Sequence, residues 1–500
     1  MNQIIRKCKS TLQTVIVCLL VIIGVVSCSS VPENVEKIDK LPVIYPDYIG
    51  VTIPVGIAPL NFNYAGKDNI ECIDVVVKGS KNGTLHANGN YADFDIDEWH
   101  KLTEQNRGGF LTFTVCIKHK GGWKQYRDFK VFVSDYALEE WGLTYRRIAP
   151  GYEVYSKMGL YQRNLSNFCE ETILENTQVP GMCVNCHTSN RTDPNQFVFH
   201  VRGDHGATMI QQKGCPEWLA AKNDLLGGSM VYPYWHPSGE YCAFSTNQTR
   251  QGFNVVPNER IEVFDLSSEV FVYNPKTHEM LMDSLLMTKD WSENSPVFSP
   301  DGQTLYFITC KQQDYPLHYK DEKYNLCKIS FDPETGNFGD HVDTLFNAVR
   351  MGKSLTWPRP SYDGKYIMFT LMDYGYFSIW HHESDQWLLD LRTGEAHPMT
   401  EANSNDADSY HNWNLNSHWF VFTSRRDDGL YSRLYLGSID ELGRVSKPFL
   451  LPQRNPKEFY TASIYSYNTP DFTKSPVQFD ARVAGQVILS DKRVQTTIHK

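Results

Sequence analysis

One stretch of this sequence decides the fold, Pro296-Val297-Phe298-Ser299-Pro300-Asp301-Gly302-Gln303-Thr304-Leu305-Tyr306-Phe307-Ile308. An apolar strand enters the segment Ser-Pro-Asp-Gly, and an alternating aromatic strand leaves it. Proline presets φ and glycine accepts a positive φ, which suits a tight turn between two strands. The stretch therefore predicts a β-hairpin.

Three further copies of this pattern lie around it, at residues 233–245, 357–370 and 412–424. Additional strand–turn units separate the copies, at 270–273, 328–331 and 387–391. The copies recur about every 60 residues with room for four strands each, which is the spacing of β-propeller blades. We therefore expect propeller repeats over residues 230–480.

The rest of the ring is expected on either side of the clear copies. A hairpin over 197–211, turning at Gly203–Gly206, and a closing segment near 460–480 raise the count to about six blades. The first blade then falls in residues 141–229. The predicted fold class is mainly β.

Residues 46–140 predict a separate β-sandwich domain. Ile70–Lys78 is rich in β-branched residues, residues 110–117 alternate between two faces, and Lys130–Val133 suggests another strand. Turn signals separate these runs. We expect this domain to act as a spacer or docking module.

The pentapeptide Cys183-Val184-Asn185-Cys186-His187 is the attachment signature of a c-type haem. Two thiols at this spacing can each bond a haem vinyl group, and the following histidine gives iron its proximal nitrogen. With 12 Cys and 16 His in 500 residues, chance would supply only about 0.01 such matches. We expect one covalent haem c, attached in a loop beside the first blade and facing the sandwich domain.

The sixth ligand of the iron stays open at this stage. The candidates nearest in sequence are His200, His205 and Met209, and Met158 or Met230 are further possibilities. A His or Met ligand would give an electron-transfer site, whereas an open position would let iron bind a small molecule. Arg202 is a candidate partner for a haem propionate.

The same cysteines allow other interpretations. A zinc site could draw on Cys169, Cys183, Cys186 and Cys215, although structural zinc usually shows two close ligand pairs. A thioredoxin-like pair would need a βαβ context, which is absent. Disulfides between 169 and 215, 72 and 116, or 310 and 327 are alternatives to free thiols.

The beginning of the chain predicts export. Arg6, Lys7 and Lys9 precede an apolar run over 15–26 that ends at Ser27-Cys28, as in a secretory signal. Residues 25–28 resemble a bacterial lipobox, so residues 1–27 are expected to be cleaved and Cys28 lipidated. Residues 28–45 read as a flexible tether, and residues 481–500 as a C-terminal tail.

Composition limits the partners. The formal net charge of −10 argues against nucleic-acid binding. The expected location is the bacterial cell envelope, with the protein anchored by its lipid to the outer membrane on the periplasmic or the surface face. The expected partner is a redox or envelope protein. Exposed tryptophans leave a glycan ligand open. Glycine-rich phosphate loops and hydrolase elbows are absent from the sequence.

The repeats resemble the TolB-type, WD40-like propeller repeat of bacterial envelope proteins. The match is close at 296–308 and looser at 413–424, where Asn416-Ser417 replaces Asp-Gly. The whole arrangement is similar to bacterial lipoproteins that join a TolB-like propeller to a single C-x-x-C-H. The segments that carry this resemblance are 152–158, 183–187, 200–203 and 423–431.

The resemblance implies two kinds of function. A mono-haem c protein with a propeller docking domain would transfer electrons or sense redox state. Some TolB-like propellers are instead pectic-oligosaccharide lyases that hold a divalent metal through channel histidines, which makes His236 and His411 candidate ligands at nearly equivalent repeat positions. A propeller that binds a glycan or protein partner is the third possibility.

Overall fold

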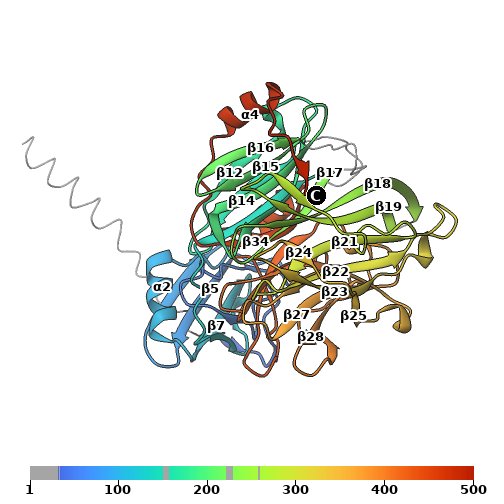
Figure 1. Cartoon of the computed structure of the whole chain (residues 1–500). Helices are drawn as coiled ribbons and strands as arrows, with labels where there is room; N and C mark the ends of the chain where they lie inside the picture. The colour runs from blue at the N-terminus through green and yellow to red at the C-terminus, as the bar shows by residue number, and fades with distance from the viewer. Residues whose placement is uncertain (1–31, 33, 150–156, 221–228, 257–258, 500) are drawn as a thin grey trace, which may run out of the picture.

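The computed structural model describes residues 32, 34–149, 157–220, 229–256 and 259–499. An N-terminal domain lies against the side of a larger ring of sheets (Figure 1). Both parts consist mainly of β-strands, as the sequence predicts.

The N-terminal domain is built on one seven-stranded sheet rather than on two sheets of similar size. Its strands are β1 (Glu36–Lys37), β3 (Thr52–Ile53), β5 (Cys72–Gly79), β6 (Thr84–Gly89), β7 (Phe110–His119), β8 (Gly122–Gln125) and β9 (Phe129–Val133). A two-stranded sheet, β2 (Ile44–Tyr45) with β4 (Asn63–Tyr64), completes the domain. Because β1 and β2 already pair with this domain, the second half of the expected tether is folded.

The helix α2 (Ile96–Gln105) was not evident from the sequence. Asp95 caps it by accepting hydrogen bonds from the backbone N–H groups of Asp97 and Glu98. Trp99 and Leu102 point from the helix into the sheet core, where Trp99 contacts the ring of Phe113. Burying these two side chains fixes the helix on one face of the sheet.

The ring is a β-propeller of six blades, each a sheet of four or five strands. Blade 1 contains β34 (Ser466–Thr473), β10 (Gly142–Ile148), β11 (Gly159–Asn164) and β12 (Glu170–Glu175). Blade 2 contains β13 (Cys183–Asn190), β14 (Asp193–Arg202), β15 (Ala207–Gln212) and β16 (Cys215–Ala220). The hairpin predicted over 197–211 is therefore the centre of blade 2.

The four clear sequence repeats form the remaining blades. Blade 3 has β17 (Ser229–Trp235), β18 (Cys242–Val256), β19 (Glu259–Asn274) and β20 (Glu279–Leu281). Blade 4 has β21 (Trp291–Phe298), β22 (Thr304–Lys311), β23 (Asn325–Asp332), β24 (Asn337–Phe338) and β25 (Asp343–Phe346). Blade 5 has β26 (Ser354–Pro360), β27 (Tyr366–Met372), β28 (Asp385–Asp390) and β29 (Ala396–Pro398), and blade 6 has β30 (Asp408–Trp413), β31 (Trp419–Ser424), β32 (Arg433–Ser438) and β33 (Phe449–Leu450).

The C-terminal part of the chain closes the ring. Strand β34 pairs with β10 in blade 1, so the inner strand of the first blade comes from the end of the propeller sequence. The inner strands contact one another in the order β34, β13, β17, β21, β26, β30 and back to β34. The predicted closing segment near 460–480 is therefore confirmed.

The N-terminal domain docks on blade 6. One hydrophobic core joins α2 and the large sheet to residues of β31, β32 and β33. At the boundary the Tyr136 ring stacks on His418 with centroids 3.7 Å apart, and Trp419 Nε1 donates to the Tyr136 carbonyl at 3.3 Å. This domain is thus fixed to one side of the propeller.

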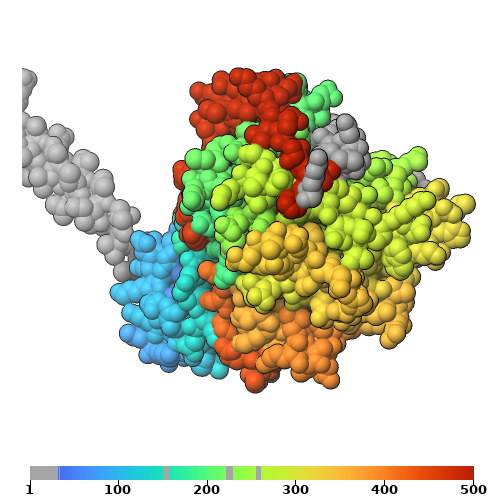
Figure 2. All heavy atoms as spheres, in the orientation of Figure 1, coloured from blue at the N-terminus to red at the C-terminus, as the bar shows by residue number. Residues whose placement is uncertain are grey.

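The residues that follow β34 are folded, which corrects the prediction of a C-terminal tail over 481–500. Helix α4 (Ala481–Leu489), at the top of the view in Figures 1 and 2, contacts β12 of blade 1 and buries Ala484 and Ile488 in a hydrophobic core that blades 1 and 2 share. Strand β35 (Thr497–Ile498) then pairs in parallel with β20 of blade 3. The C-terminal residues therefore join blades 1, 2 and 3.

The expected signal segment and the lipidation site Cys28 lie outside the described residues. Within the described ranges, every helix is too short or too polar to cross a membrane.

Candidate functional site

Each of the six inner strands carries the same irregularity. At one point two consecutive residues of the inner strand face a single residue of the next strand, which defines a β-bulge. The two-residue bulges are Thr469-Pro470, Cys186-His187, Tyr232-Pro233, Ser295-Pro296, Trp357-Pro358 and Tyr410-His411, in blades 1 to 6. The C-x-x-C-H motif therefore coincides with the bulge of blade 2.

The first residue of every bulge has a positive φ, between 47° and 55°. None of the six is glycine, so each costs on the order of 1–3 kcal/mol of backbone strain. The residue opposite each bulge is aromatic: Tyr145, Phe199, Phe244, Phe307, Phe369 and Phe422. A bulge re-aims side chains, and four of the first bulge residues, Cys186, Tyr232, Tyr410 and Thr469, line a common cavity.

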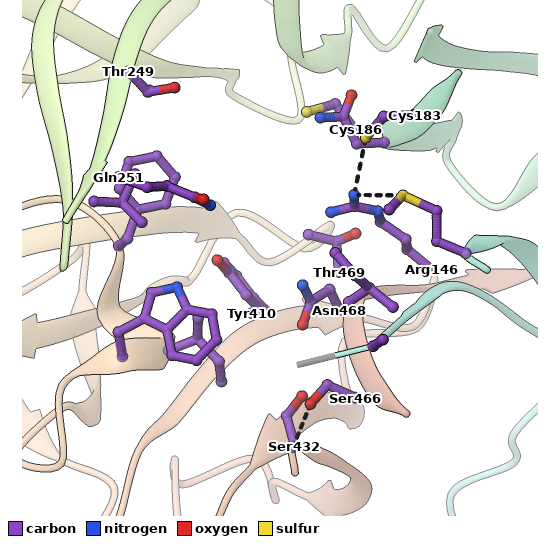
Figure 3. A pocket seen from close by; sticks show the side chains of 18 of the residues that line it. Arg146, Cys183, Cys186, Thr249, Gln251, Tyr410, Ser432, Ser466, Asn468 and Thr469 are labelled. Atoms are coloured by element: carbon purple, nitrogen blue, oxygen red, sulfur yellow. Dashed lines mark hydrogen bonds between the residues drawn. The ribbon is translucent and has the colours of Figure 1, made fainter. Parts of the chain in front are cut away.

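This cavity, of about 470 Å³, is lined by residues of four inner strands, β34, β13, β17 and β30, and by residues of β10, β14, β18, β19 and the short helix η4 (Ser378–Trp380). Its volume lies in the range of small-molecule sites, roughly 300–1,000 Å³. Its polar and sulfur-bearing lining residues are Arg146, Met158, Cys183, Asn185, Cys186, Arg202, Thr249, Gln251, Arg425, Ser432, Ser466, Asn468 and Thr469. Figure 3 shows Arg146, Cys183 and Cys186 together on one side and Gln251 on the opposite side.

Both cysteines of the motif line this cavity. They lie in β13, so the loop expected for haem attachment is a strand, and the cavity lining contains no residue of the N-terminal domain among those described. Both side chains are free thiols. Burial raises the pKa of the Cys186 thiol, and the guanidinium groups of Arg202 and Arg146 oppose that rise.

The imidazole of His187 is placed differently. It is 5% exposed, does not line the cavity, and its Nε2 lies 3.1 Å from Thr144 Oγ1. Its Nδ1 is buried without a hydrogen-bond partner. Burial lowers the pKa of His187 to about 4, so the ring is neutral at pH 7.

The fit of this site to a haem c is therefore divided. The two thiols, the cavity volume and the aromatic lining suit covalent attachment of a porphyrin. The neutral imidazole, with one unpaired nitrogen, has the chemistry of an iron ligand but is packed beside Thr144 rather than in the cavity. The two cysteines are placed to attach a haem, whereas the imidazole nitrogens of His187 do not face the cavity.

The three sequence-predicted sixth ligands are not brought to the cavity. His200 is buried and its Nδ1 lies 2.9 Å from Thr208 Oγ1; His205 pairs with Asp491; Met209 is buried in the core of blade 2. Met230 lies in the core between blades 2 and 3. Met158 does line the cavity, as does Arg202.

Within the described part of the chain, the cysteines are not arranged as a zinc site or as disulfide bonds. Cys169 and Cys215 are exposed near the outer strands β12 and β16, whereas Cys183 and Cys186 lie on an inner strand. All nine described cysteines are free, and no group of three or more His, Cys, Asp or Glu residues there could hold a metal ion.

His236 and His411 do not occupy equivalent positions. His236 lies four residues beyond the first bulge residue of blade 3, in a turn, and its Nε2 contacts the Gly302 carbonyl oxygen at 3.1 Å. His411 is the second bulge residue of blade 6 and is buried. The residue of this chain that matches His411 is His187, so the earlier alignment of the two histidines is wrong.

Several cavity residues were missed in the sequence: Arg146, Tyr232, Phe377, Trp380, Tyr410 and Arg425. A signal for two of them exists, because the first bulge residue always lies four positions before the residue that begins the turn. Counting back from His236 and Asn414 gives Tyr232 and Tyr410. Phe377 precedes the short helix η4 and Trp380 ends it, and no repeat position marks this helix.

The comparisons with known proteins concern the fold. No protein-family model matches the sequence, and no curated protein matches it either. Among solved structures, an oligogalacturonate lyase in complex with manganese is similar at 11% identity and a TM-score of 0.36, over 61% of this chain and 73% of that chain. The β-propeller domain of the Trilobed protease from Pyrococcus furiosus is similar at 12% identity and a TM-score of 0.33, over 70% of this chain and 97% of that chain.

Prolyl oligopeptidase B from Galerina marginata is a third neighbour, at 13% identity and a TM-score of 0.35, over 62% of this chain. The match spans only 44% of that enzyme. These likenesses are of propeller to propeller, and the chemistry of this chain is argued from its own cavity.

Proposed function

We propose that this propeller holds one haem c in its central cavity and acts as a one-electron carrier or redox sensor in the cell envelope. The observation that carries the proposal is that both thiols of the only C-x-x-C-H motif in the sequence line the cavity, to which four of the six inner strands contribute. A motif that arose by chance would have no reason to place both sulfur atoms there.

Cys183 and Cys186 would form the covalent attachment. Each thiol would add across one vinyl group, with sulfur bonding the inner carbon and the thiol hydrogen going to the terminal carbon, so that no oxidant would be needed. When bound, the haem supplies one-electron chemistry whose potential depends on axial ligands and on the burial of the site. The chain's own contribution is to exclude water with Tyr232, Phe377 and Tyr410.

Haem attachment of this kind takes place outside the cytoplasm, so the proposal includes export and lipidation at Cys28. It also includes a redox partner or envelope protein that docks on the propeller. Both parts rest on the sequence of the first 28 residues and on the haem itself.

The deciding experiment is expression of the full chain with its signal in a host that matures c-type cytochromes. We expect a pyridine haemochrome spectrum of the thioether type and a denatured mass that includes one haem per chain. Cys183→Ala with Cys186→Ala is expected to abolish both signals, whereas Cys242→Ala, a buried thiol outside the cavity, is the matched control. Absence of covalent haem in the exported wild type would refute the proposal.

A second function is favoured by the aromatic lining of the same cavity. Trp380, Tyr410 and Tyr232 offer ring faces of the kind that stack on sugars, and Asn468, Gln251 and Ser466 offer hydrogen bonds. A haem-free propeller would then bind an oligosaccharide. Calorimetric binding of oligosaccharides to exported protein that carries no haem would support this candidate.

A further inference from the structure

The charged residues that line the cavity are opposite in sign to the net charge of the chain. Three arginines line it, Arg146, Arg202 and Arg425, and no Asp, Glu, Lys or His is found among its described lining residues. The chain as a whole has a formal net charge of −10. Positive charge is therefore concentrated where a ligand would be enclosed.

Arg146 has no carboxylate partner within the described ranges. Its Nη2 lies 3.2 Å from Cys183 Sγ and 3.4 Å from Met158 Sδ, as the dashed lines in Figure 3 show, and its Nε is buried without a partner. Sulfur is a weak acceptor, and a guanidinium carries five N–H donors. The adjacent Arg147 forms an ion pair with Glu170, so the two neighbouring arginines differ in whether their charge is neutralised.

Arg202 lies beside the same cysteine. It ends β14, and its partner in the strand register is Cys183. The ion pairs that arginines form with carboxylates among the described residues do not include Arg202. Arg146 and Arg202 therefore flank the thiol pair from β10 and β14.

Arg425, the third arginine of the cavity, has its hydrogen bonds to backbone carbonyl groups. Its Nη1 and Nη2 donate to the carbonyl oxygens of Ile379 and Gly429, and its guanidinium lies 5.4 Å from the Trp380 ring centre. It holds the aromatic wall formed by η4. Two cationic groups thus face an aromatic wall across a cavity of about 470 Å³.

We infer that Arg146 and Arg202 form a carboxylate-binding subsite, and that the ligand of the cavity is a ring compound with at least two carboxylates. Partly buried guanidinium groups without a counter-charge pay for lost hydration, and bidentate hydrogen bonds from carboxylates would offset that cost. The inference deepens the proposed function, since haem carries two propionates. An acidic oligosaccharide offers the same chemistry.

The test separates the subsite from covalent attachment. Full-length exported protein with Cys183→Ser and Cys186→Ser is titrated with protoporphyrin IX and with its dimethyl ester, following quenching of tryptophan fluorescence. We expect the diacid to bind at least about tenfold tighter, which corresponds to one bidentate charge-assisted contact. Equal affinity for the two porphyrins, with no preference for an acidic sugar either, would overturn the inference.

Single arginine substitutions identify the residues responsible for the preference for the diacid porphyrin. Arg146→Gln and Arg202→Gln should each reduce the preference for the diacid, and Arg146→Lys should keep part of it. Arg147→Gln removes a charge one residue away but outside the cavity, and should leave the preference unchanged. Circular dichroism of each variant shows that it is folded. A preference that survives in Arg146→Gln and Arg202→Gln would contradict the assignment.

Two further measurements distinguish the sources of the carboxylates. If the wild type carries haem, loss of either positive charge should lower its reduction potential, because the oxidised iron is the more positive form; an unchanged potential contradicts the subsite. If the wild type carries no haem, arginine-dependent binding of trigalacturonate over an uncharged trisaccharide supports the subsite while the haem proposal fails.

Discussion

Blades 2 and 6 carry the same local structure with different chemistry. Cys186-His187 and Tyr410-His411 are the bulges of the inner strands β13 and β30, with φ of 50° and 51° at the first residue. In both, the first residue faces the cavity and the histidine is buried outside it. The other four blades have proline where these two have histidine.

The comparison teaches that the fold supplies the position and the sequence chooses the chemistry. The bulge recurs in every blade, and in four of the six blades its first side chain lines the cavity, whether that side chain is a thiol, a phenol or a hydroxyl. A thiol at this point in blade 2 therefore becomes a cavity group, and a second thiol three residues earlier completes the pair. The histidine's place is inherited from the blade repeat, which explains why it is packed like His411.

The largest expected effect is at the cavity-facing residues. Cys186→Ala should remove one of the two thioether bonds to the haem. The single thioether that is left can be detected by mass spectrometry and by a shift of the haemochrome spectrum. Tyr410→Phe, at the equivalent position of blade 6, should leave covalent attachment unchanged because it removes only a hydroxyl group. Equal haem loss in both variants would show that the cavity shape, not the thiol, controls attachment.

The next largest effect is expected for proline substitutions at His187 and His411. His187→Pro and His411→Pro should both fold, with losses of about 1–2 kcal/mol, because four blades already have proline at this position and the strand ladder skips it. Thr188→Pro is the control, since Thr188 is paired with Val198 in the ladder and its loss should cost about 3 kcal/mol or more. Thermal denaturation measures all three.

The same pair of variants decides what His187 does for the iron. If His187 moves to ligate haem, His187→Pro changes the visible spectrum of the loaded protein and His411→Pro does not. An unchanged spectrum in His187→Pro would show that the histidine has only the packing role seen at blade 6.

Acid stability gives a smaller difference. Burial lowers the pKa of His411 to about 3, below the ordinary value of about 6.5. The unfolded chain therefore binds the extra proton first, and this histidine costs stability as the pH falls below about 6.5, by an amount on the order of a few kcal/mol near pH 3. His411→Pro should have a denaturation midpoint that falls less between pH 7 and pH 4 than that of the wild type. Parallel midpoints would contradict it.

The smallest effect concerns the turn of blade 6. Ser417 has a φ of 63° where blade 5 has Gly364 at 72°. Gly364→Ala should cost about 1 kcal/mol, because its Cβ would make only an ordinary contact with Pro300 Cγ at 3.9 Å but its φ remains unfavourable. Ser417→Gly should change stability by less than about 0.5 kcal/mol, since relief of strain is offset by loss of the hydrogen bond that Ser417 Oγ accepts from the Asp363 N–H at 3.1 Å. Chemical denaturation measures both.

The propeller was predictable because its turns and alternating strands repeat locally. Residues 296–308 and their three copies lie on blades 3 to 6 as expected, and the hairpin at 197–211 gave a further blade. The helix α2 was not predictable from its surroundings, because Trp99 and Leu102 are held by a sheet core whose strands are distant in sequence. The folded C-terminal segment was missed for the same reason, since α4 is stabilised by packing in a core that blades 1 and 2 share.

The repeat, the approximate number of blades and the two thiols at haem-attachment spacing can be read from the amino-acid sequence, because each depends on residues close together in the chain. The direction in which those thiols face depends on how the blades pack. The tertiary structure set Cys183 and Cys186 on an inner strand, placed Arg146 and Met158 of blade 1 beside them, and packed His187 next to Thr144. These neighbours come from two adjacent blades, so only the packing of β10 and β11 of blade 1 against β13 of blade 2 brings them together.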